Sequence, residues 1–201
     1  MAMPTIIPTS PDARYPQNYR FLAQGRTAAQ PRVHATGRVA VGRYRVRMAL
    51  LDADEFERWR EQATATMTAA AAIRAAGSWS WCCFLCEQAA QLATKGLLRA
   101  IGRPSDAWGH DLVTLVARAG EAMGEPLSSA AMADASARLT RHDIPARYPD
   151  AHPAGTPADH YRESDAASAT ADADRLIGAV DAVWHDLGSG TDRRDADGES
   201  G

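Results

Sequence analysis

Apolar residues recur every three or four positions through most of this chain, in segments separated by glycine or proline. The first such segment, about 53–76, follows Asp52, which is suited to cap a helix, with Glu55 three positions later as in a capping box. Its apolar positions are Phe56, Trp59, Ala63, Met67, Ala70 and Ile73. This spacing matches the period of an α-helix and not that of a strand, so it predicts an all-α fold.

Four further segments show the same pattern. We expect helices from Ser78 to Gly102, from about 109 to 124, from Ser128 or Ser129 through Leu139, and from about 164 to 187. The stripe of the second helix contains Trp81, Cys82, Leu85, Ala89, Leu92, Gly96 and Leu97. Short connections make consecutive helices antiparallel, and the sequence therefore predicts an up-and-down bundle of four to five helices.

The composition agrees with this fold class. Alanine supplies about a fifth of the 201 residues and aromatic residues only 6%. Sandwiches and barrels need short runs of β-branched and aromatic residues, so they are excluded. Because alanine buries little apolar surface, the core of the bundle must be thin and closely packed.

The ends of the chain differ from its middle. Residues 1–47 contain scattered prolines and arginines without a sustained period, and we expect this segment to be disordered or weakly ordered. Met48 stands just before the patterned region, so one interpretation is an overextended translation start, and the other is a basic arm that touches RNA. Residues 48–188 then form the bundle, and residues 189–201 form an acidic disordered tail.

Charge is divided between these parts. Residues 1–47 carry eight arginines and one acid, which leaves 14 basic and 24 acidic residues in 48–201. An acidic bundle argues against a broad phosphate-binding face, so any contact with nucleic acid must be local. No apolar run has the length of a membrane helix, and no apolar signal core follows Met1. We expect a cytoplasmic protein without membrane contact.

Three cysteines, Cys82, Cys83 and Cys86, form the densest cluster of metal-ligand side chains. A tetrahedral zinc site needs four ligands, and the chain has no further cysteine. We therefore interpret them as small buried apolar residues and expect no metal. The chain also lacks a Walker glycine loop and a dinucleotide fingerprint, and we expect no cofactor.

His110 and Asp111 open the third predicted helix. An acid in the first turn interacts favourably with the helix dipole, so the pair has a structural interpretation. The catalytic interpretation adds Arg103, which precedes His110 by seven positions, because an arginine and a histidine together can hold a phosphate and move a proton.

A second group of bases lies near the end of the fourth predicted helix and contains Arg138, Arg141, His142 and Arg147, followed by Tyr148. Arginine forks suit phosphate oxygens, and a tyrosine can stack on a base. The alternative is that Arg147 pairs with Asp143 or Asp150 and that Tyr148 closes the loop over the bundle. Four prolines space out residues 143–162, a long connection of the kind that often carries function.

Five motifs in order resemble those of a prokaryotic HEPN domain: Gly77-Ser-Trp-Ser-Trp-Cys-Cys-Phe-Leu-Cys-Glu-Gln-Ala-Ala90, Lys95-Gly-Leu-Leu98, His110-Asp-Leu112, Ile144-Pro-Ala-Arg-Tyr-Pro-Asp150, and Asp165-Ala166 before the last helix. The resemblance covers about residues 52–187. It implies a homodimeric helical bundle, often encoded beside a minimal nucleotidyltransferase as a toxin–antitoxin-like pair. Active relatives resemble metal-independent endoribonucleases with an Arg-x(4–6)-His motif at a dimer cleft, and others bind nucleotides.

We therefore expect a dimeric module that binds a nucleotide or an RNA phosphate. In this interpretation Lys95 and Arg147 hold phosphate, His110 donates or accepts a hydrogen bond, and Tyr148 stacks on a base. Asp111, next to His110, is a further candidate ligand-binding residue. One alternative is a metal-independent endoribonuclease toxin, with Arg103 stabilising phosphate and His110 as acid and base. The other is a non-catalytic structural bundle that binds a partner.

Overall fold

The computed structural model describes residues 51–198, with side chains as far as Ser189, and they contain helices and no strand. The helices are α1 (Ala53–Ala75), α2 (Trp79–Ala100), α3 (Leu112–Met123), α4 (Ala130–Thr140), α5 (Pro157–His160) and α6 (Glu163–Gly198), with a 3-10 turn, η3 (Pro149–Ala151). The predicted all-α class is thus confirmed. The expectations for residues 1–47 fall outside the described part of the chain.

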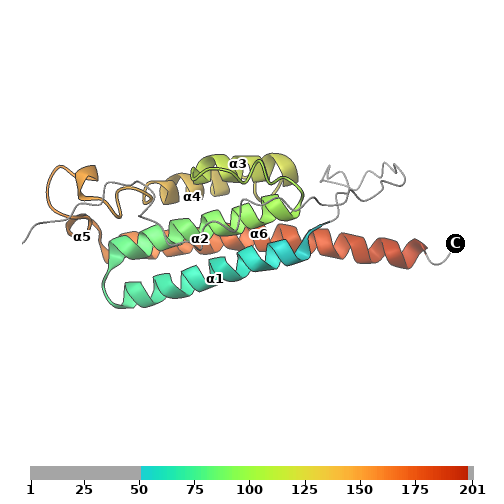
Figure 1. Ribbon diagram of the computed structural model, residues 1–201, viewed down its shortest axis with the longest axis horizontal. Helices are drawn as coiled ribbons and strands as arrows, with labels where there is room; N and C mark the ends of the chain where they lie inside the picture. The colour runs from blue at the N-terminus through green and yellow to red at the C-terminus, as the bar shows by residue number, and fades with distance from the viewer. Residues whose placement is uncertain (1–50, 199–201) are drawn as a thin grey trace, which may run out of the picture. The chain divides into compact units, whose positions relative to one another are not determined.

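Helix α2 is the centre of the bundle. It packs against α1, α3, α4 and α6, and the three long helices α1, α2 and α6 run alongside one another (Figure 1). Its buried apolar residues are mostly small: Cys82, Cys83, Cys86, Ala89, Ala90, Ala93, Leu97, Leu98 and Ala100. Small side chains let several neighbours approach one helix, which is the thin, close-packed core that the composition predicts.

The contact between α1 and α2 is close at Gly96. A Cβ atom added to Gly96 would lie 2.6 Å from the Cβ atom of Trp59, a separation that packed carbon atoms do not reach. Ala63 and Ala70 on α1 are fully buried. The close packing of α1 against α2 therefore depends on the absence of a side chain at Gly96.

Local capping follows the sequence signals at three helix starts. The carboxylate of Asp52 accepts a hydrogen bond from the Glu55 N–H (2.9 Å), and Asp111 and Ser129 cap α3 and α4 in the same way. Ser78 precedes α2, but its hydroxyl makes no capping bond. The Glu55 carboxylate does not complete a capping box, because it accepts a hydrogen bond from Arg99 on α2 (2.6 Å).

Two expectations need correction. The last helix does not end near Leu187 but continues to Gly198, so residues 189–198 are helical where a disordered tail was expected. No proline interrupts this stretch, and each added residue extends a helix that is already nucleated. Trp81, predicted on the buried stripe of α2, is 47% exposed. Because α2 has neighbours on several sides, its buried residues are spread too widely around the helix to define one stripe.

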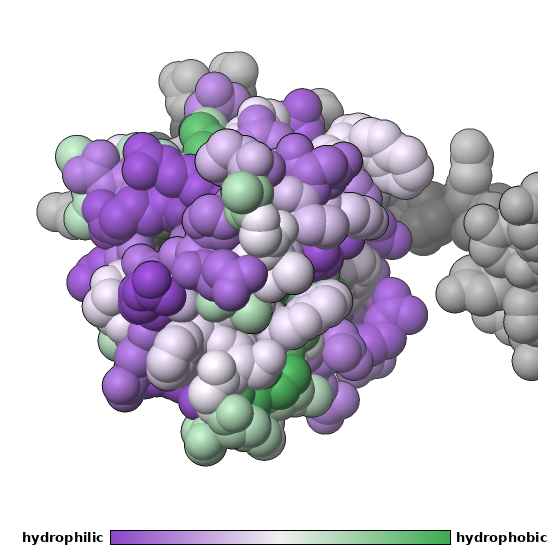
Figure 2. Space-filling view, turned by 90° about the vertical axis from the view of Figure 1, so that its left-hand side faces the viewer, coloured by the Kyte–Doolittle hydropathy of each residue, from purple (hydrophilic) through white to green (hydrophobic). Residues whose placement is uncertain are grey.

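The connection 143–162 contains the two shortest helical elements, and each begins with a proline, Pro149 in η3 and Pro157 in α5. Proline suits a first helical position because its missing N–H has no partner there. The end of the bundle at which α5 lies is largely hydrophilic, with small scattered apolar patches (Figure 2). None of the described helices is both long enough and apolar enough to span a bilayer.

Candidate functional site

A hollow of about 580 Å³ lies where α3 begins and α4 ends. Helices α3 and α4 are joined by a short connection and pack together, so the first turn of one lies beside the last turn of the other. The lining residues are His110, Asp111, Thr140, Arg141, Asp143, Ile144 and Pro145. Of the residues predicted from sequence, His110 and Asp111 line this hollow.

Both carboxylates of the hollow are already engaged. Asp111 accepts hydrogen bonds from the Val113 N–H (3.1 Å) and from the Thr114 hydroxyl, and so caps α3. Asp143 forms an ion pair with Arg147, with 2.9 Å between guanidinium nitrogen and carboxylate oxygen. Their negative charges are therefore partly neutralised within the protein.

Two polar groups of the hollow have no such partner. Arg141 is exposed, and no carboxylate of the described residues lies within ion-pair distance of its guanidinium group. The hydroxyl oxygen of Thr140 is buried and makes no hydrogen bond. The hollow also adjoins the start of α3, which Asp111 already caps, and the end of α4, the negative end of that helix dipole. A free guanidinium group beside an unpaired hydroxyl favours an anion.

The other bases of the sequence cluster are committed to structural contacts. Arg138 donates two hydrogen bonds to the buried carboxylate of Asp172 on α6 (2.6 and 2.8 Å). His142 shares a hydrogen bond with the Tyr161 hydroxyl (3.2 Å). Arg141 is the member of the cluster that faces the hollow without a protein partner among the described residues. Sequence analysis placed Arg141 in this cluster but did not single it out.

Arg147 supports the loop. Its Nε donates to the Asp143 carbonyl (2.7 Å), and its guanidinium carbon lies 4.5 Å from the centre of the Phe84 ring and 5.1 Å from that of Tyr148. Pairing with Asp143 was the structural alternative for this residue, and the geometry agrees with it. Tyr148 remains 47% exposed, so part of the residue is open to a ligand.

A polar ladder on α2 lies behind the hollow. The amide nitrogen of Gln91 donates to Glu87 (2.7 Å) and to the backbone carbonyl of His110 (2.8 Å), while its oxygen accepts from Lys95 (2.9 Å). Lys95 does not line the hollow, and burial lowers its pKa. The ladder thus anchors the chain at His110 to α2, and Lys95 orients the Gln91 amide.

Glu87 is the buried end of this ladder. Burial raises its pKa to about 7 against the opposing effect of hydrogen bonds from Gln91 and Gln88, and the charge of Asp143 raises it further. Sequence analysis missed Glu87. The available signal was Glu87, Gln91 and Lys95 at intervals of four, a polar line on an otherwise apolar helix.

A histidine pair is linked to Pro145, one of the residues that line the hollow. His152 and His160 stack with ring centres 4.2 Å apart, and the Nε2 atom of His152 lies 2.8 Å from the carbonyl oxygen of Pro145. Arg147 and His152 also have the Arg-x4-His spacing, which sequence analysis overlooked. In the structure each of the two side chains contacts a backbone carbonyl of the connection 143–162.

Arg103 lies apart from this arrangement. Its guanidinium group forms an ion pair with Asp106 in the same loop, and it does not line the hollow beside His110. The cysteines Cys82, Cys83 and Cys86 are fully buried, and two of them contact the Thr170 hydroxyl. No group of three or more metal-ligating side chains is found among the described residues.

Comparisons with known proteins agree with the sequence resemblance. The model of the HEPN domain family matches residues 56–183. TT1696 from Thermus thermophilus is 35% identical, with 64% of this chain and 98% of that chain covered and a TM-score of 0.59. ST0689, an archaeal HEPN homologue, is 29% identical, with 63% and 95% covered and a TM-score of 0.52. No curated protein matches. Because the family match spans more than half of the sequence, the chain belongs to the HEPN domain family.

Proposed function

We propose that this HEPN domain is a dimeric module that binds a nucleotide or an RNA phosphate in the hollow between α3 and α4. The observation that carries the proposal is Arg141, an exposed guanidinium group without an ion-pair partner among the described residues, beside the start of α3. Phosphate oxygens would pair with Arg141 and accept a hydrogen bond from the unpartnered Thr140 hydroxyl.

The remaining predicted residues take supporting roles. His110 lines the hollow and donates or accepts a hydrogen bond, and the exposed Tyr148 ring offers a stacking surface for a base. Arg147 holds that ring in place, and Lys95 acts through Gln91 on the position of His110. In this assignment Arg141 contacts the phosphate directly, in place of Lys95 and Arg147, which the sequence analysis assigned to that role.

Assembly is part of the same proposal. The described residues expose five large apolar side chains, Trp81, Trp108, Val113, Ile144 and Tyr148. Ile144 lines the hollow, and Trp108 and Val113 are each two residues away in sequence from one of its lining residues. Exposed tryptophan and tyrosine are enriched in protein interfaces, which supports a homodimer. The further proposal, that the partner is a minimal nucleotidyltransferase in a toxin–antitoxin-like pair, is based on the family resemblance.

Equilibrium binding tests this proposal. The probes are adenosine 5′-monophosphate and a fluorescently labelled, unstructured 12-nucleotide RNA at constant salt, because salt strongly changes phosphate affinity. Arg141→Ala is expected to weaken binding of at least one probe about tenfold or more, the equivalent of one charged hydrogen bond. Arg58→Ala, which removes the same charge from the exposed side of α1, is the control and should bind as the wild type does. Equal affinity for the wild type and Arg141→Ala, or no binding by either, contradicts the proposal.

The endoribonuclease alternative, with Arg103 and His110 as its residues, keeps one supporting observation, because His110 lines the hollow. It predicts that expression of residues 48–201 arrests growth and that His110→Ala relieves the arrest. The non-catalytic structural alternative predicts that Arg147→Ala lowers the melting temperature and that every RNA and nucleotide assay is silent.

A further inference from the structure

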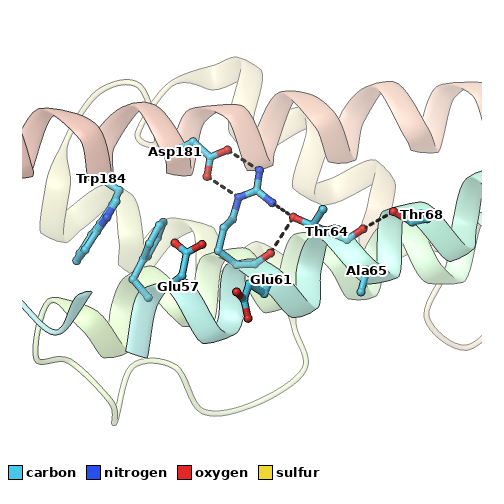
Figure 3. A pocket seen from close by; sticks show the side chains of 9 residues that line it. Glu57, Glu61, Thr64, Ala65, Thr68, Asp181 and Trp184 are labelled. Atoms are coloured by element: carbon cyan, nitrogen blue, oxygen red, sulfur yellow. Dashed lines mark hydrogen bonds and ion pairs between the residues drawn. The ribbon is translucent and has the colours of Figure 1, made fainter. Parts of the chain in front are cut away.

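A second concavity lies on different helices from the hollow. This trough, about 710 Å³, runs between α1 and α6 and is lined by Phe56, Glu57, Arg60, Glu61, Thr64, Ala65, Thr68, Asp181 and Trp184. Figure 3 shows the two helices side by side, with one side chain of α1 bonded across the gap to Asp181. The stacked rings of Phe56 and Trp184, with centres 4.2 Å apart, are a second link between the helices.

The cation in the trough is already paired. Arg60 donates through Nε and one terminal nitrogen to both carboxylate oxygens of Asp181, at 2.6 Å each, and through the other terminal nitrogen to the Thr64 hydroxyl. The hydrogen bonds that Arg60 donates to the Asp181 carboxylate raise the pKa of Arg60. Its charge therefore serves to join α1 to α6.

Two of the three acids of the trough, Glu57 and Glu61, form no ion pair within the described residues, although the charge of Glu57 acts on Arg60. Glu57 and Glu61 are exposed and lie one helical turn apart on α1. Neither carboxylate forms an ion pair or accepts a hydrogen bond within the described part of the chain. Like charges four residues apart destabilise a helix by a few tenths of a kcal/mol. A cation supplied from outside would remove this repulsion.

Beyond Glu61 the exposed side chains of α1 are small and uncharged. Thr64, Ala65, Thr68 and Ala69 are exposed, and no ionisable residue occurs from Ala63 to Ile73. A helix face that meets only solvent normally carries charged side chains. Short side chains also let a second helix approach to the 8–10 Å that helix packing requires.

We propose that the trough between α1 and α6 binds an amphipathic, cationic helix of a partner protein. Two Lys or Arg residues one turn apart on that helix pair with Glu57 and Glu61, since opposite charges select and orient a partner. Its apolar side packs on the small residues of α1 and reaches the Trp184 ring. The proposal does not depend on nucleotide binding, because the trough and the hollow share no residue.

The experiment uses the full chain and two synthetic 18-residue peptides built from Ala and Leu, one with paired Arg residues one turn apart and one with Glu at the same positions. Fluorescence anisotropy of the labelled peptides at physiological salt gives the affinities. The trough variant is Glu57→Lys/Glu61→Lys. Its matched control is Glu121→Lys/Asp134→Lys, which makes the same charge change at exposed acids of α3 and α4.

We expect the cationic peptide to bind the wild type and the control equally and the trough variant at least tenfold more weakly. Filling the trough with Ala65→Trp should weaken binding without changing charge, and the acidic peptide should bind none of these proteins. Undetectable binding to the wild type, or equal weakening in both charge variants, overturns the proposal. Light scattering gives another result that would overturn the proposal. If the wild type and the control are dimers and the trough variant is a monomer, the trough is occupied by a second copy of this chain.

Discussion

Replacement of Glu87 by glutamine should make the protein more stable at neutral pH. Glu87 is fully buried on α2, and its pKa is raised from 4.5 to about 7, chiefly by burial. Glutamine has nearly the same shape and keeps an oxygen that accepts the hydrogen bond from Gln91. The second hydrogen bond of Glu87 is donated by Gln88. The side chain of Gln88 is partly exposed, so its amide can turn over and accept a hydrogen bond from the amide of the new glutamine.

The magnitude follows from proton linkage. A carboxyl group whose pKa is higher in the folded state binds more protons there than in the unfolded chain. The free energy of unfolding therefore falls as the pH rises from about 4.5 to about 7 and then stays level. At about 1.4 kcal/mol per pH unit, this loss amounts to about 3 kcal/mol. Below pH 4.5 Glu87 is protonated in both states, and the wild type carries no penalty.

Urea denaturation of the wild type and Glu87→Gln at several pH values from 4.5 to 8 measures this effect. The difference in unfolding free energy between the two proteins should grow with pH, by up to about 3 kcal/mol in favour of Glu87→Gln. His142, whose pKa burial lowers, is present in both proteins, so its titration largely cancels in the difference. A difference that is the same at pH 5 and pH 8 would refute the reasoning, because Glu87 would then not titrate in this range.

Three further outcomes are expected. Gly96→Ala should cost about 1 kcal/mol or more in urea denaturation, since overpacking against Trp59 exceeds the gain in helix propensity; unchanged stability would mean that α1 moves away freely. Asp172→Asn should cost about 2 kcal/mol at pH 7 by weakening its bonds to Arg138. Because the folded pKa of Asp172 is lowered, chiefly by Arg138, wild-type stability from this group is lost as the pH falls through that pKa, and the gap to Asp172→Asn should close in acid. Arg147→Ala should lower the melting temperature by a few degrees, as expected for about 1 kcal/mol, and a stability equal to the wild type would argue against its ring contacts.

Local signals predicted the helices well. The first was expected over 53–76 and spans Ala53–Ala75, and the cap at Asp52 forms as its spacing indicates. Such features depend on residues within one or two turns, so the chain itself carries them. The end of α6 was predicted less well, because glycine lowers helix propensity without forbidding the helix.

The candidate site was predicted only in part. His110 and Asp111 line the hollow, but Lys95 lies behind it and Arg147 is held by Asp143. Glu87 escaped notice because a glutamate in a helical pattern is ordinarily exposed. Its burial depends on the neighbours that surround α2.

The sequence by itself determined the all-α class, most helix boundaries and the resemblance to the HEPN family, which the family model confirms over residues 56–183. Only the tertiary structure decided which bases are free to meet a ligand. Arg138 is neutralised by Asp172, 34 positions away on another helix, while Arg141, three residues later, has no partner among the described residues. The physical reason is that an ion pair requires a few ångströms between charges, and the folded arrangement of distant helices sets that distance.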